Sequence, residues 1–99
     1  MQMDDLKVGQ VVRSLAGRDK GQFMIVCELL DQNYVTVCDG VLRKISNPKK
    51  KKIKHLAKTN HIVTIIKEKL DNGEKVNNAE IRKCLESFNR FDDGNSEEV

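Results

Sequence analysis

The chain has no tryptophan, one tyrosine and one proline, and its three phenylalanines are not clustered. This shortage of aromatic side chains argues against a proline-peptide groove or a methyl-lysine cage, because both need several rings together. No apolar run approaches the ~20 residues that span a bilayer. The start of the chain also lacks a basic segment followed by an apolar one. We therefore expect a cytoplasmic protein with no membrane partner.

Cysteine is scarce as well, with three residues that lie far apart and form no CxxC pair. Cys27, Cys38 and Cys84 are accordingly predicted to be reduced core thiols, because neither a disulfide framework nor a zinc site fits their spacing. The sequence contains no phosphate-binding P-loop and no nucleophile beside a histidine. We expect neither a cofactor nor an enzymatic activity.

Positive charge is abundant and unevenly distributed. Residues 1–58 hold 12 Lys and Arg against 6 Asp and Glu, whereas residues 59–99 hold 6 against 9. Residues 43–58 contain eight basic residues and no acidic one. A field of that sign attracts polyanions, so the basic half is expected to contact nucleic acid.

Short β-branched segments separated by turns occupy the first 58 residues. Strands are predicted at residues 11–15, 23–27, 34–38, 41–45 and 51–56, with turns at Asp31–Asn33 and at Asp39-Gly40. This pattern predicts a mainly β domain over residues 1–58, built as a small antiparallel SH3-like barrel. A monomer is expected.

Helical spacing replaces strand alternation from Asn60 onward, so residues 59–91 are predicted to form a two-helix appendage. Gly73 suits the end of the first helix, and Asn77 with Glu80 can form a capping box at the start of the second. The apolar faces consist of Ile62, Ile65, Ile66 and Leu70, and of Ile81, Cys84, Leu85 and Phe88. Residues 92–99 are predicted to be a disordered acidic tail.

A glycine-bracketed loop precedes the second strand. Gly17 and Gly21 flank Arg18 and Lys20, and the apolar residues 23–26 follow. This segment resembles the KOW motif of ribosomal and transcription proteins. From about residue 6 to 59 the order of motifs is similar to the archaeal and eukaryotic large-subunit ribosomal protein family numbered fourteen and its small bacterial relatives. The resemblance implies an RNA-binding barrel that binds ribosomal RNA in the ribosome, or during translation or assembly.

The basic residues of this half are the candidate RNA contacts. Glycines let a loop approach a phosphate closely, and the Lys49–Lys52 run is predicted to be a constrained loop after Pro48. Asp19 is expected to organise its own turn. With no aromatic platform, recognition of folded RNA through its backbone and shape is favoured. The candidate site comprises Arg13, Gly17, Arg18, Lys20, Gly21, Arg43, Lys44, Lys49, Lys50, Lys51, Lys52, Lys54 and His55.

Three questions remain open at the level of sequence. Arg13 interrupts an apolar strand face, so it can pair with an acid or point toward RNA. His55 can hydrogen-bond to RNA or cover the edge of the barrel. The whole chain can instead be a protein-interaction module of a transcription or translation complex, binding through its C-terminal helices, if the apolar face of the second helix is exposed.

Overall fold

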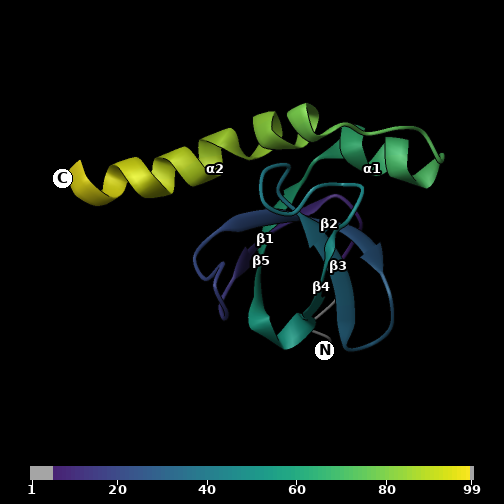
Figure 1. Cartoon of the computed structure of the whole chain (residues 1–99), viewed down its shortest axis with the longest axis horizontal. Coiled ribbons are helices and arrows are strands. Elements are labelled where there is room, and N and C mark those ends of the chain that lie inside the picture. The colour runs from purple at the N-terminus through teal and green to yellow at the C-terminus, as the bar shows by residue number, and fades with distance from the viewer. Residues whose placement is uncertain (1–5, 99) are drawn as a thin grey trace.

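The structure is a computed structural model that describes residues 6–98, and the side chains of residues 6–89. It is mainly β: a five-stranded antiparallel sheet with two helices along one side (Figure 1). The strands are β1 (Gln10–Ser14), β2 (Phe23–Leu29), β3 (Tyr34–Cys38), β4 (Lys49–Lys52) and β5 (Leu56–Ile62), in the order β4-β3-β2-β1-β5. The helices are α1 (Thr64–Asp71) and α2 (Asn78–Glu98). The sheet is open, because β4 and β5 form its two edges.

Both faces of the sheet are buried. Because successive side chains of a strand point to opposite faces, neighbouring residues of β1 and β2 enter different cores. Val11 and Ile25 face the helices, together with Cys38, Ile66, Ile81 and Leu85. Val12, Met24 and Val26 face the other way, together with Leu6, Val35 and Val37. The helices thus share a core with the sheet.

The predicted strand at residues 41–45 is wrong, because this segment is a loop. The carboxylate of Asp39 accepts the backbone N–H groups of Val41 and Arg43 at 2.9 Å each. Farther along, the Ile45 N–H donates to the Asn78 side chain at 2.8 Å. Side-chain oxygens therefore accept the backbone N–H groups that a strand would have donated to a neighbouring strand.

The Lys49–Lys52 run, interpreted as a constrained loop, is instead the fourth strand, and the strand predicted at residues 51–56 therefore begins earlier and ends at Lys52. A three-residue 3-10 turn, Ile53–His55, separates it from β5. β5 continues to Ile62, so the domain boundary predicted at Lys58 falls inside this strand and the first helix begins later than Asn60. Pairing explains the difference: Gln10 lies opposite Ile62 and its side chain donates to the Thr59 carbonyl at 2.8 Å.

The end of α1 and the start of α2 agree with the local sequence signals. Asn77 accepts the Glu80 N–H at 2.9 Å, while Glu80 accepts the Asn77 N–H at 3.3 Å, which confirms the capping box. Gly73 follows α1 with a φ of 73°. α2 continues to Glu98, through the segment predicted to be a disordered tail. Once a helix has started, each further residue adds a hydrogen bond at little cost, so an acidic sequence can extend it; Val99 lies outside the described residues.

The apolar face of α2 is buried against the sheet. Ile81 and Leu85 are at most 1% exposed, and the Phe88 ring lies 5.3 Å from the Phe23 ring between centroids. The three cysteines are free thiols. A hydrogen bond with Cys38 and burial both raise the pKa of the Cys27 thiol.

Gly40 lies where the β3–β4 loop packs closely on α2, so a substitution there tests this contact. Its φ is +79°, and a Cβ atom built there would lie 2.5 Å from the Asn78 carbonyl oxygen of α2. We expect Gly40→Ala to cost about 1–2 kcal/mol from backbone strain and about 1–3 kcal/mol more from the clash, measured as a lower Tm. Gly73→Ala is the control, because its φ is +73° but nothing lies within 4 Å. Equal losses in the two variants would contradict close packing of this loop on α2.

Candidate nucleic-acid interface

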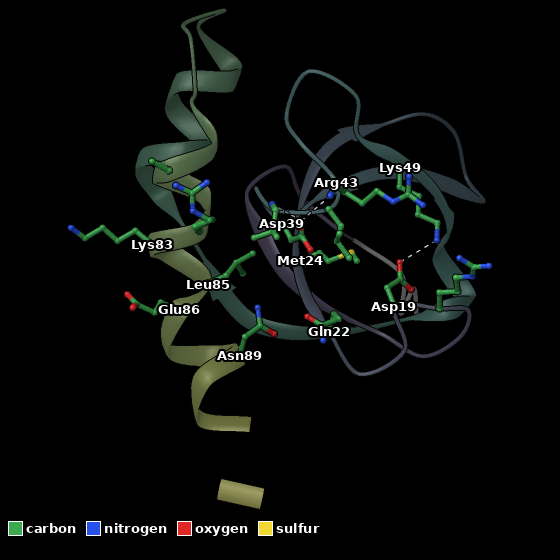
Figure 2. Close-up of a pocket in the computed structure, with 15 residues that line it drawn as sticks. Asp19, Gln22, Met24, Asp39, Arg43, Lys49, Lys83, Leu85, Glu86 and Asn89 are labelled. Atoms are coloured by element: carbon green, nitrogen blue, oxygen red, sulfur yellow. Dashed lines mark hydrogen bonds and ion pairs between the residues drawn. The ribbon is translucent and has the colours of Figure 1, made fainter. Parts of the chain in front are cut away.

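A cavity of about 1050 Å³ opens where two loops meet α2 (Figure 2). One loop joins β1 to β2 and contains the two bracketing glycines; the other joins β3 to β4. Met24 and Leu85, each 1% exposed, form part of its apolar floor. Val41 and Leu42 border it from the second loop and are 55% and 80% exposed. The cavity therefore has an apolar interior and a wide opening to solvent.

Positive side chains surround this opening. Arg18 comes from the first loop, Arg43 from the second, Lys49 from the start of β4 and Arg82 from α2. Arg82 is fixed by a 3.1 Å hydrogen bond from its Nη1 to the Gly40 carbonyl oxygen. Lys83 also borders the cavity but points away from the loops (Figure 2). Four cations from four separate segments thus gather at one opening.

Three acidic residues also line the cavity: Glu86 of α2 is exposed, whereas Asp39 and Asp19 are engaged in internal contacts. Asp39 is 8% exposed and accepts backbone hydrogen bonds from its own loop. Asp19 receives Lys51 Nζ at 2.6 Å, Lys49 Nζ at 3.1 Å and the Ser14 hydroxyl at 2.6 Å. Asp19 thus organises its loop through side chains of β1 and β4, whereas the expectation was that its carboxylate would organise its own turn.

Asp19 and Lys51 form a largely desolvated ion pair. Their side chains are 10% and 6% exposed, and Lys51 also donates to the Ala16 carbonyl at 2.9 Å. Burial raises the pKa of Asp19, but the hydrogen bonds from Lys51, Ser14 and Lys49 outweigh it and hold that pKa far below its usual range. The pair ties the glycine-bracketed loop to β4.

Strand alternation divides the four consecutive lysines. Lys49 and Lys51 reach Asp19, whereas Lys50 and Lys52 are exposed. Lys51 therefore has a structural role in the folded protein, and Lys50 and Lys52 are the exposed members of the run. A lysine this deeply buried keeps its charge because the carboxylate lies next to it.

The remaining predicted residues lie in different places. Gly17 and Gly21 have φ values of +88° and +89°, and a Cβ atom built at either position would make only ordinary van der Waals contacts, with Lys51 Nζ at 3.6 Å and Arg13 Nη2 at 4.0 Å respectively. Arg13 is exposed, and its guanidinium lies 5.7 Å from the centroid of the Phe23 ring. Lys20 and Lys44 are exposed on the two loops.

Three further predicted residues follow β4. Lys52 and Lys54 border a second cavity. His55 is half-buried, and its carbonyl oxygen accepts the Leu15 N–H at 2.9 Å, so its backbone joins the turn to the end of β1. The candidate residues therefore form two groups rather than one continuous surface.

Sequence interpretation missed the polar residues of α2 that face the loops. Besides Arg82, Asn89 accepts the Phe23 N–H at 3.0 Å and Asn78 accepts the Ile45 N–H at 2.8 Å. Their spacing at 78, 82 and 89 places them beside Leu85 on one helix face. That alignment was the available signal, because it marks polar residues bordering a buried stripe.

No known protein-family model matches the sequence. Within the described residues, no group of three or more His, Cys, Asp or Glu side chains is placed to hold a metal ion. Nor does the described part of the chain contain a helix long and apolar enough to cross a membrane.

Removing the carboxylate at Asp19 should destabilise the fold. Asp19→Asn leaves the Lys51 ammonium buried without its counter-charge, so we expect a loss of about 2–4 kcal/mol in the free energy of unfolding, measured by urea denaturation. The double variant Asp19→Asn with Lys51→Met should recover much of that loss, because it no longer buries a charge. A double variant as unstable as the sum of its single variants would show that the two side chains are not coupled.

The same pair predicts an acid-dependent loss of stability. Because its pKa is lowered on folding from an ordinary value of 3.8, Asp19 stabilises the protein fully above that value and loses its contribution as the pH falls further. The difference in unfolding free energy between the wild type and Asp19→Asn should therefore shrink below about pH 4. Equilibrium unfolding at a series of pH values measures it. A difference that stayed constant down to pH 2 would count against the lowered pKa.

Proposed function

We propose that this protein binds structured RNA, with ribosomal RNA as its target, and that it is a KOW-type domain with an SH3-like barrel, acting in the cytoplasm in translation or ribosome assembly. The observation that carries the proposal is the convergence of Arg18, Arg43, Lys49 and Arg82 at one opening. The glycine-bracketed loop that resembles the KOW motif supplies the first of these. The basic β3–β4 loop, expected from the same resemblance to face RNA, supplies the second.

The connection between the edge strands supports the barrel. A flat five-stranded sheet would hold its edges about 19 Å apart, yet the 3-10 turn that joins β4 to β5 advances only about 6 Å. The sheet must therefore roll strongly to bring its edges near each other. The buried cluster on the side away from the helices, which includes Val12, Met24 and Val37, fits the interior of such a roll.

The arrangement of cations favours the phosphate backbone of a folded RNA. Arg18 and Arg43 are exposed, and neither forms an ion pair with another described residue. Guanidinium groups suit phosphates because their donors match two oxygens at once. Positions on different loops also fix the distance between the phosphates that they can contact, so the site selects for shape rather than for base sequence.

The alternative is a protein-interaction module. One observation counts against it, because the face of α2 that was expected to bind a partner is buried, with Ile81 0% exposed. Leu42, however, is 80% exposed at the rim of the cavity, next to Val41. A protein partner would contact this loop, so Leu42→Ser should weaken partner capture while leaving RNA affinity nearly unchanged.

The proposal predicts how RNA affinity depends on salt. Arg18→Gln with Arg43→Gln should weaken binding to purified large-subunit ribosomal RNA and reduce the slope of log affinity against log salt by roughly 1.4–1.8, the contribution of two phosphate contacts. Filter binding at several salt concentrations measures both. Lys75→Gln is the control, because this exposed residue lies between the helices and borders neither cavity.

Crosslinking in the protein's own cells identifies the RNA. Sequencing of the RNA recovered with a tagged wild-type protein should enrich one region of large-subunit ribosomal RNA, and the double arginine variant should lose that enrichment. RNA at background level, with specific proteins recovered instead, would favour the interaction module.

A further inference from the structure

A second cavity of about 580 Å³ shares no lining residue with the first. It lies between the β2–β3 hairpin, the end of β4 with its 3-10 turn, and β5, at the end of the sheet remote from α2 (Figure 1). Its size falls within the range of about 300–1,000 Å³ typical of small-ligand sites. Ile53 and Leu56, both half-buried, give it an apolar floor.

The polar residues of this cavity are all neutral or positive. Lys52, Lys54 and Lys58 are exposed along one border, and no described residue that lines the cavity is acidic. Asp31 lies near in sequence, but one oxygen of its carboxylate accepts the N–H groups of Asn33 and Tyr34 at 2.8 Å each. That carboxylate is thus used to close the hairpin, and the three ammonium groups are left to bind an anion.

Tyr34 adds a flat surface to this positive border. The Lys50 ammonium lies 4.5 Å from the centroid of its ring and covers one face. Tyr34 lines the cavity, whereas Lys50 does not. An aromatic ring at the border of a positive cavity is the kind of group on which a base stacks. Exposed Gln32 and Asn33 stand at the same border and offer amide groups to the edge of a base.

We propose that this second cavity binds an unpaired nucleotide of single-stranded RNA, with the base against Tyr34 and the adjoining phosphates on Lys52, Lys54 and Lys58. The inference rests on the proposed function for the identity of the polymer, and it adds a separate subsite for unpaired RNA. A nucleotide combines a flat base with a negative backbone. The apolar floor, the aromatic ring and the amides suit the base, and the ammonium groups suit the phosphates.

The single tyrosine makes this proposal easy to test, because one set of ring signals in a ¹H–¹³C NMR spectrum reports on this site. Titration of the full chain with a single-stranded hexauridylate should shift the Tyr34 ring signals, whereas a fully paired RNA duplex should leave them in place. Uridine monophosphate should bind far more weakly than the hexamer, because it reaches fewer of the lysines. Equal affinity for the monophosphate would overturn the assignment to an RNA strand.

Variants separate stacking from charge. Tyr34→Leu should lower hexauridylate affinity about 5-fold or more, whereas Tyr34→Phe keeps the ring and should stay within 2-fold of the wild type. Lys54→Gln with Lys58→Gln, two exposed positions chosen to leave the fold intact, should reduce the salt slope by roughly 1.4. Unmoved ring signals, or no change in affinity in these variants, would overturn the proposal.

The two RNA proposals fail separately. Binding of ribosomal RNA that depends on Arg18 and Arg43, with no effect of hexauridylate on Tyr34, would refute the second subsite alone. Shifted Tyr34 signals without any binding of structured RNA would refute the proposed function and leave the subsite standing.

Discussion

The ion pair between Asp19 and Lys51 is the interaction on which the arrangement of the basic surface depends. It joins the loop between β1 and β2 to β4, although two strands lie between β1 and β4 in the sheet. Since both side chains are nearly buried, the loop cannot move away without leaving the Lys51 ammonium buried and unpaired. The position of Arg18 at the border of the cavity follows from this link, because Arg18 is next to Asp19 in the chain.

Strand parity explains how one lysine run supports the fold and also supplies surface charge. Lys49 and Lys51 point toward Asp19, while Lys50 and Lys52 are exposed to solvent. A continuous block of ammonium groups would repel itself, and alternation separates neighbouring charges onto opposite faces. Pairing two of them with a carboxylate reduces the remaining repulsion, so the exposed members keep their charge available for a polyanion.

Sequence alone predicted the features that depend on neighbours in the chain. The Asp31–Asn33 turn, the Asn77–Glu80 capping box and the end of α1 before Gly73 all rest on contacts within four residues. Predictions failed where distant residues compete. Asn78 takes the Ile45 N–H from 33 residues away, and Gln10 holds residues 59–62 in a strand from 49 residues away. No local pattern contains that information.

The candidate site shows the same division between local and distant contacts. Composition and the glycine spacing showed where the cations lie in the chain. They did not show which lysines are paired with a carboxylate, because that pairing depends on Asp19, some 30 residues away. The contribution of α2 was hidden for a related reason: Arg82 is positioned by the Gly40 carbonyl, 42 residues earlier. A helix with more acidic than basic residues thus supplies a cation to the basic opening. The net charge of a segment does not show which of its side chains face the loops of the sheet. The charge of a surface is set by packing as much as by composition.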